Sequence, residues 1–238
     1  MSAVPVAVVF GARNVGRAVV AERLEAGWAV VAMVRTQATA DALLEAHPQT
    51  TVLVGDASRG ADVERVLAAA EDLGDLELIV NAITAPPRDQ GFGGGPIADA
   101  PEDRLRYWMD GFVPMAWQII RLGTRALRSR GGGTVVQVAG GSARRSFPGG
   151  GPWGAAQHAV KALIQSLAAE SREHGVHVAL LIADGFVETE RRPIGDDDPR
   201  SVLHPYDLAA AAAYLHGQSP RGWTHELTLT PALEPWTP

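Results

Sequence analysis

The chain has 238 residues, of which 46% are hydrophobic and none is cysteine, and its formal net charge at pH 7 is −6. This length suits one well-cored domain, the absence of cysteine excludes disulfides and thiolate chemistry, and the acidic balance argues against binding nucleic acid or anionic membranes. No apolar run is long enough to span a bilayer and the N-terminus has no leader pattern, so we expect a soluble cytoplasmic protein.

The first predicted unit is a strand, a glycine turn and a helix. Val6–Phe10 is an apolar run typical of a strand buried on both faces, and Val15–Leu24 has apolar residues at helical spacing. Between them, Gly11–Gly16 brings backbone N–H groups and the positive end of a helix to one point, which suits a pyrophosphate. The first and last residues of this turn match Gly-x-Gly-x-x-Gly, but Arg13 stands where the second glycine is expected. The alternative is a turn that only packs the helix on the sheet.

Further apolar runs alternate with helical segments along the rest of the chain. The other expected strands are Ala29–Arg35, Thr51–Val54, Leu76–Asn81, Thr134–Ala139, His177–Ile182 and His225–Thr230. The other expected helices are Ala38–Ala46, Asp62–Leu73, Glu102–Ser129, Trp153–Glu173 and Pro205–His216. This order predicts one Rossmann-like α/β domain over residues 1–238, with a doubly wound parallel sheet of about seven strands flanked by helices. Ligands of such sheets bind beyond the carboxyl ends of the strands.

Several connecting segments have features of their own. Ala85–Gly95 is rich in proline and glycine and predicts a mobile loop at the carboxyl edge of the sheet. Asp99 and Glu102 have the spacing of a capping box before the long helix, and Pro114 should kink or interrupt that helix. The charged segment Glu188–Arg200 is broken by proline and glycine and predicts a flap.

With the whole order laid out, the chain resembles the short-chain dehydrogenase/reductase family over nearly its full length. The stretches that resemble the family are Val31-Ala-Met-Val-Arg35, Gly55-Asp-Ala-Ser58, Ile79-Val-Asn-Ala-Ile83, Ser166-Leu-Ala-Ala-Glu170, Gly175-Val-His-Val178 and Trp223-Thr-His-Glu-Leu227. The resemblance implies a small-molecule substrate. By fold-level analogy it also implies a homodimer or homotetramer formed through the helices at 102–129 and 153–173.

The resemblance further implies a nucleotide cofactor, with NADP(H) favoured over NAD(H). Arg35 would face the 2′-phosphate, because a guanidinium gives bidentate hydrogen bonds to phosphate whereas a carboxylate would pair with a free hydroxyl. Asp56 would accept from the adenine amine, and Asn81 would line the ribose. The positions implied to hold the cofactor are Gly11, Arg13, Asn14, Val15, Gly16, Arg35, Asp56, Ala57, Asn81, Ala82, Gly185, Val187 and Thr189. The alternative is a solvated Arg35, an Asp56 that serves only a turn or cap, and no cofactor.

The catalytic positions of the family are replaced in this chain. The family uses Tyr-x-x-x-Lys on one helix, with a serine and an asparagine earlier in the chain, to move the carbonyl-side proton. Alignment on Glu170 puts these positions at Trp153, Gln157, Gly140 and Asp110. Tryptophan offers only an indole N–H, and glutamine has no charge to depress a neighbouring pKa. Shifting the register so that Lys161 fills the lysine position restores no tyrosine.

Other proton-transfer groups are therefore candidates. A carboxylate beside Trp153 would have its pKa raised by desolvation, and both Asp110 and Asp184 are expected near the carboxyl edge. Ser142 lies two residues from the position of the missing serine and is a candidate to replace it. The candidate catalytic residues are Asp110, Ser142, Trp153, Gln157 and Asp184. No metal site is expected, because no histidine pair with a third ligand has metal-ligand spacing.

Three functions follow as alternatives. The first is a divergent NADP(H)-dependent reductase acting on a small, partly apolar molecule, such as an activated alkene or imine, by a non-standard mechanism. The second is a non-redox cyclase, dehydratase or isomerase that has lost the cofactor site. Its substrate pocket would be bounded by Trp153, Phe147, Trp117 and Trp108. The third is a catalytically inactive protein that senses the cofactor or binds a partner.

Overall fold

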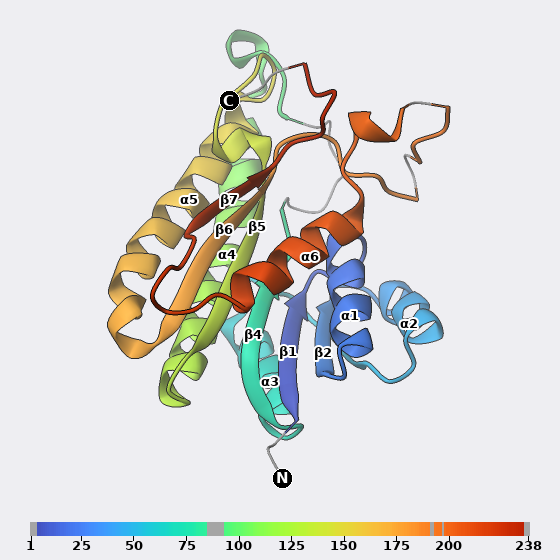
Figure 1. Cartoon of the computed structure of the whole chain (residues 1–238). Coiled ribbons are helices and arrows are strands. Elements are labelled where there is room, and N and C mark those ends of the chain that lie inside the picture. The colour runs from blue at the N-terminus through green and yellow to red at the C-terminus, as the bar shows by residue number, and fades with distance from the viewer. Residues whose placement is uncertain (1–3, 85–92, 191–192, 197, 236–238) are drawn as a thin grey trace.

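Seven parallel strands form a single twisted sheet at the centre of the molecule (Figure 1). The computed structural model describes residues 4–84, 93–190, 193–196 and 198–235. In sequence order the strands are β1 (Pro5–Phe10), β2 (Ala29–Val34), β3 (Thr51–Val54), β4 (Asp75–Asn81), β5 (Gly133–Gly140), β6 (Val176–Ala183) and β7 (Glu226–Leu229). Their order across the sheet is β3-β2-β1-β4-β5-β6-β7, which confirms the predicted doubly wound α/β fold.

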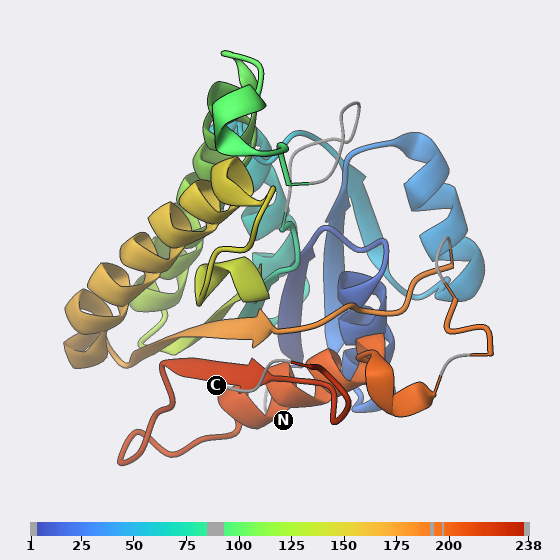
Figure 2. The same cartoon turned by 90° about the horizontal axis from the view of Figure 1, so that it is seen from above.

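Helices cover both faces of this sheet, as Figure 2 shows from above. They are α1 (Val15–Glu25), α2 (Gln37–Ala46), α3 (Gly60–Glu71), α4 (Arg104–Ser129), α5 (Gly151–Ser171) and α6 (Pro205–His216). The helices α3, α4 and α5 pack into one layer of the core, and α1, α2 and α6 pack into the other. None of the helices in the described part of the chain is both long and apolar enough to cross a membrane.

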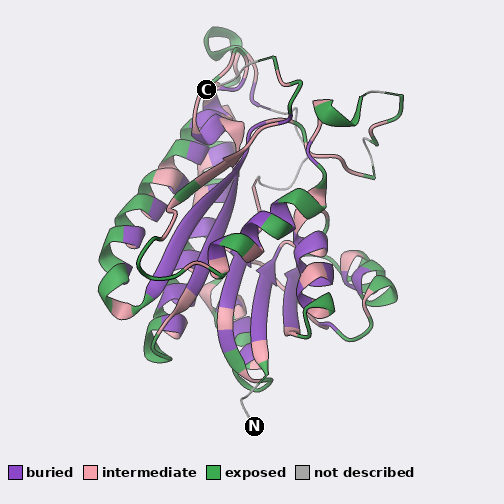
Figure 3. Ribbon diagram, in the orientation of Figure 1, coloured by how far each residue is buried: buried purple, intermediate pink, exposed green. Residues whose placement is uncertain are grey.

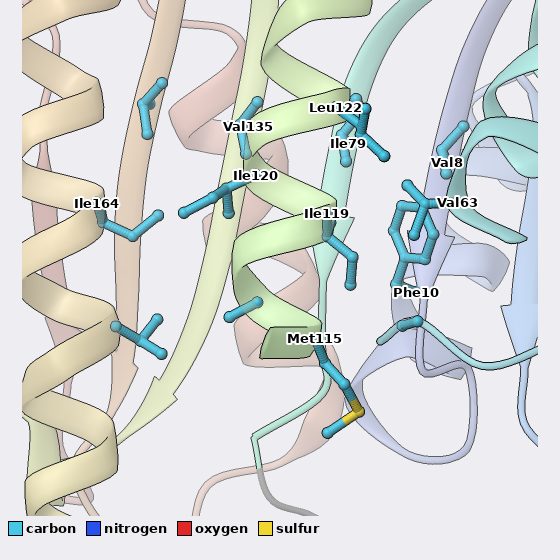
Figure 4. Close-up of a cluster of buried hydrophobic side chains, with 14 of the residues drawn as sticks. Val8, Phe10, Val63, Ile79, Met115, Ile119, Ile120, Leu122, Val135 and Ile164 are labelled. Atoms are coloured by element: carbon cyan, nitrogen blue, oxygen red, sulfur yellow. The ribbon is translucent and has the colours of Figure 1, made fainter. Parts of the chain in front are cut away.

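Successive side chains along each strand point to opposite faces of the sheet and pack into the two layers of the core. On β1, Val8 and Phe10 point to the layer under α3 and α4, whereas Ala7 and Val9 point to the layer under α1. Figure 4 shows the first of these layers, where Ile119 of α4 lies beside Phe10. The central strands are buried along almost their whole length (Figure 3). Their apolar carboxyl ends converge on one edge, which places the loops that follow them side by side.

The predicted start of α4 is wrong in its detail. The helix begins at Arg104 after Asp103, which makes no side-chain capping hydrogen bond, so the capping box at Asp99 and Glu102 does not form. Asp99 instead ends a short 3₁₀ helix, Ile97–Asp99. The proline at position 114 does not interrupt α4. Of the predicted mobile loop, residues 85–92 lie outside the described residues.

Candidate functional site

The glycine turn after β1 is held in a conformation that only glycine suits. Gly11 has φ +87°, and a Cβ there would lie 2.8 Å from Ile83 Cγ1. A Cβ on Gly16 would lie 2.6 Å from the carbonyl oxygen of Gly11. Glycine is needed at position 11 because of its φ angle and its close contact with Ile83. It is needed at position 16 because α1 packs closely on the turn.

The first turn of α1 is open to an anion. Asn14 precedes the helix without capping it, and the first turn contains no acidic residue. The first N–H groups of a helix lack intrahelical partners and bind phosphate or carboxylate well. The Asn14 amide instead donates to the Glu188 carbonyl oxygen at 3.1 Å, which ties the segment after β6 to the glycine turn.

A pocket of 170 Å³ opens beside this turn, between α1 and α2. Arg13 and Arg17 line it together with Thr39, Leu43 and Glu190. Arg17 Nη2 lies 2.6 Å from Glu190 Oε1. The chain therefore presents two guanidinium groups at the place where Arg13 departs from the glycine pattern. Sequence reasoning missed Arg17 and Glu190, because the approach of Glu190 to the start of α1 depends on the path of a segment far along the chain.

The two residues predicted to hold the adenosine end follow the next two strands of the sheet, Arg35 after β2 and Asp56 after β3. Arg35 is exposed just after β2 and does not line the pocket. Asp56 accepts hydrogen bonds from the Ser58 backbone N–H at 3.0 Å and from the Ser58 hydroxyl at 2.8 Å. The backbone bond is the largest cause that lowers the pKa of Asp56, and the charges of Arg35 and Arg59 lower it further. Asp56 thus serves the turn before α3, with Ala57 buried beside it.

Asn81 at the end of β4 is completely buried, and both ends of its amide are occupied. Its Nδ2 donates to Gln137 Oε1 at 2.7 Å, and its Oδ1 accepts from the Ile83 N–H at 3.1 Å. These two bonds fix the orientation of the Asn81 amide between β4 and β5. Ala82 and Ile83 present the edge of β4. Gln137 on β5 was missed, because its link to β4 depends on pairing between distant strands.

The Trp153 ring fills the space above the end of β5. A Cβ on Gly140 would lie 2.7 Å from Trp153 Cζ2, so the indole occupies the volume that a side chain at this position would need. The ring lies 6.2 Å from Trp108 and 5.9 Å from Phe147 between centroids. Trp117 is 45% exposed on α4, in contrast to the buried Trp108 on the same helix.

Gln157 lies on α5 after Trp153, at a spacing that places both side chains on one face. It is buried, and its Nε2 donates to the Thr84 carbonyl oxygen at 2.7 Å. Its Oε1 is buried and has no hydrogen-bond partner within the described part of the chain. His158, next to it, is exposed and bonds the Gly154 carbonyl oxygen.

The two candidate carboxylates have different surroundings from those predicted. Asp110 is exposed on α4, so the expectation that Trp153 would desolvate it is wrong. Asp184 is buried at the end of β6, where its partners are guanidinium groups. Its Oδ2 lies 3.0 Å from Arg144 Nη1, and its Oδ1 lies 3.5 Å from Arg145 Nη2. This paired carboxylate anchors the loop after β5 instead of standing free as a proton donor.

Ser142 lies in that loop, on a short 3₁₀ helix, Gly141–Ala143. It is buried, and its hydroxyl has no hydrogen-bond partner among the residues that the structure describes. The segment after β6 then crosses the carboxyl edge. Gly185 packs closely on Pro231, and Val187 forms a bridge with Leu203; Thr189 follows in the same segment. Among the described residues, no three histidine or acidic side chains are grouped to hold a metal ion.

Comparisons with known proteins agree on one family. The family model described as short chain dehydrogenase matches residues 5–197. Farnesol dehydrogenase of Aedes aegypti is 27% identical over 243 residues, which covers 96% of each chain. A solved variant of actinorhodin polyketide ketoreductase with NADPH has a TM-score of 0.81 at 20% identity, covering 99% of this chain and 100% of that one. Gluconate 5-dehydrogenase from Burkholderia cenocepacia J2315, in complex with NADP and tartrate, has a TM-score of 0.79 at 20% identity, covering 96% of this chain and 94% of that one.

Proposed function

Because the chain belongs to the short-chain dehydrogenase family, we propose that it binds NADP(H) along the carboxyl edge of its sheet and reduces a small, partly apolar molecule without a tyrosine acid. The observation that supports this most directly is the glycine turn with an uncapped α1, set beside a pocket that two arginines line. A fold of this kind binds its ligand at this edge.

The residues present fit both the pyrophosphate and the 2′-phosphate of such a cofactor. The backbone from Gly11 to the first turn of α1 would hold the pyrophosphate, because its N–H groups and the helix dipole favour negative charge. Arg13 and Arg17 line the adjoining pocket, and Arg35 stands exposed at the end of β2. Guanidinium groups bind phosphate bidentately, so these three side chains supply the preference for a 2′-phosphate.

The chain's own residues restrict what the site does with the substrate. Bound NADPH supplies a hydride. Trp153 offers no group that exchanges a proton near neutral pH, and Gln157 is neutral. Asp184 is paired with arginines. A ketone needs a proton donor on its oxygen during reduction, whereas an activated alkene or an imine can take its proton from water or from the Ser142 hydroxyl. The proposed substrate is therefore an activated alkene or an imine.

One observation favours a second candidate, an inactive protein that senses the cofactor. The Trp153 ring lies directly against Gly140, in the volume where a reacting carbonyl would have to approach the end of β5. In this alternative the chain binds NADP(H) but leaves it unreacted.

The test is to follow NADPH absorbance with purified protein and a matched pair of substrates. An α,β-unsaturated ketone and its saturated analogue have the same carbon skeleton and differ in the alkene. The proposed reductase consumes NADPH with the unsaturated compound and not with the saturated ketone. Reduction of the saturated ketone would contradict the proposal, and binding of NADPH without any oxidation would favour the inactive alternative.

A further inference from the structure

Two neighbouring side chains of α4 hold buried N–H groups that no acceptor satisfies within the described part of the chain. These groups are Nε of Arg104 and Nε1 of Trp108. Trp108 is only 2% exposed, so bulk water does not replace the missing acceptor. Native proteins rarely bury a donor without a partner, and a buried indole N–H usually has one. Two such donors on adjacent turns of one helix point to a place that receives an acceptor atom from a ligand.

Both side chains lie on one face of α4, because residues four positions apart are neighbours on a helix. The start of α5 packs against both of them. The centroids of the Trp108 and Trp153 rings are 6.2 Å apart. A Cβ on Gly94 would lie 2.8 Å from Pro152 Cγ and 3.1 Å from Arg104 Cγ. Since the Trp153 ring also covers the end of β5, the two donors lie at the carboxyl edge of the sheet.

The chemistry of this pair suits a ligand oxygen that gains negative charge. Within the described ranges, no carboxylate lies at ion-pair distance from Arg104. A guanidinium and an indole N–H donate hydrogen bonds and accept none. The oxygen of an α,β-unsaturated ketone or aldehyde is an acceptor of this kind. An imine is reduced most readily as its cation, which the positive charge of Arg104 would repel.

We propose that Arg104 Nε–H and Trp108 Nε1–H donate to the carbonyl oxygen of an α,β-unsaturated ketone or aldehyde, and that this class is the substrate. The proposal rests on the reductase function proposed above and narrows its substrate to one class. In the reaction the β carbon takes the hydride from NADPH, and the alkene electron pair moves toward the oxygen, which becomes an enolate. The α carbon then takes a proton from water, and NADP⁺ is the oxidised product. Donors at the oxygen stabilise its charge as it develops.

A chromophoric substrate analogue tests the donor pair without turnover. The probe p-dimethylaminocinnamaldehyde is an α,β-unsaturated aldehyde whose visible absorption band moves to longer wavelength when its oxygen accepts strong hydrogen bonds. It is titrated to saturation with the protein and NADP⁺, which has no hydride to transfer. We expect a red shift in the wild type and a smaller one in Trp108→Phe and in Arg104→Met. Trp117→Phe is the matched control and should keep the full shift, because Trp117 is 45% exposed on the same helix.

Turnover of an α,β-unsaturated ketone with NADPH gives a second measurement. Loss of one donor to a developing oxyanion lowers kcat about a hundredfold, and we expect a fall of this order in Trp108→Phe. Arg104→Met should lower kcat as well. Arg106→Met is its control and should keep the wild-type kcat, since Arg106 is exposed two residues further along α4.

The outcomes separate the donor pair from the function on which it rests. An equal shift in the wild type, Trp108→Phe and Arg104→Met, or no shift in the wild type, would overturn the pair. A shift without oxidation of NADPH by the unsaturated ketone would support the pair and contradict the proposed reductase. Thermal unfolding shows whether each variant folds. If Trp108→Phe does not fold, Arg104→Met, at a position only partly buried, must show the smaller shift by itself.

Discussion

At the scale of single residues, the shape of the site depends on how neighbouring side chains share the available space. Gly140 has φ −88° and ψ 169°, a backbone conformation open to any residue, so its need for glycine comes from space alone. Trp153 fills that space. The absence of a side chain at Gly140 on β5 and the large ring of Trp153 on α5 are therefore complementary in volume.

This pairing predicts that Gly140→Ser alone destabilises the protein. The new Cβ would meet the indole ring at 2.7 Å, and overpacking of this kind costs about 1–3 kcal/mol. Urea unfolding of Gly140→Ser, Trp153→Tyr and the double variant gives the coupling between the two sites. The double variant should recover part of the loss. Equal stability of Gly140→Ser and wild type would show that the ring moves aside freely.

Residue-scale sequence reasoning placed several candidate residues at one edge of the sheet, but it did not predict their contacts. It placed Trp153, Gln157, Ser142 and Asp184 at one edge of the sheet, because the carboxyl ends of parallel strands meet there. It could not foresee that Asp184 would be paired by arginines. Such contacts depend on rotamers and on pairing between segments far apart in the chain, which composition and spacing do not encode.

At the scale of elements, the sequence predicted strands better than helix starts. Thr51–Val54 and Pro205–His216 begin and end as predicted, since apolar runs and Pro at a first helical position are strong signals. The start of α4 failed because Pro101 follows Ala100, which is extended at φ −68° and ψ 140°. Proline disfavours the helical conformation of the residue that precedes it. A helix capped by Asp99 would have to continue through Ala100, so Asp99 does not cap α4.

The junction of α6 with β6 depends on a buried histidine. His177 Nδ1 lies 3.1 Å from the Leu215 carbonyl oxygen, and its Nε2 lies 2.9 Å from that of Thr224. Burial lowers the pKa of His177, and burial together with the charge of Arg23 lowers that of His216 at the end of α6. The native state therefore favours the neutral rings, whereas the unfolded chain takes up protons near its ordinary pKa of 6.5.

These shifts predict that the protein loses stability as the pH falls below 6.5. The unfolded state binds more protons there, so the contribution of the two histidines is fully present only above that pH. The free energy of unfolding, measured in urea across this range, should fall less steeply in His177→Gln. His158→Gln, at an exposed position on α5, is the control and should follow wild type. An unchanged pH dependence in His177→Gln would remove His177 from this account.

At the scale of the whole molecule, the architecture follows from the alternation of strands and helices alone. Parallel strands need crossover helices and crossovers are right-handed, and the observed order β3-β2-β1-β4-β5-β6-β7 obeys both rules. That architecture brings the glycine turn, the end of β4 and the start of α5 together at one edge. The same convergence is what makes a dinucleotide the proposed ligand, since its two halves need positions on both sides of the turn.

The central claim is that this edge binds NADP(H) through its 2′-phosphate. The most direct test is a calorimetric titration of the purified protein, stripped of nucleotide, with NADPH and separately with NADH, repeated with Arg35→Ala. We expect clear NADPH binding, much weaker NADH binding, and an NADPH affinity that falls about tenfold in the variant while NADH affinity does not change. Equal affinity for the two nucleotides, or binding of neither, would contradict the account.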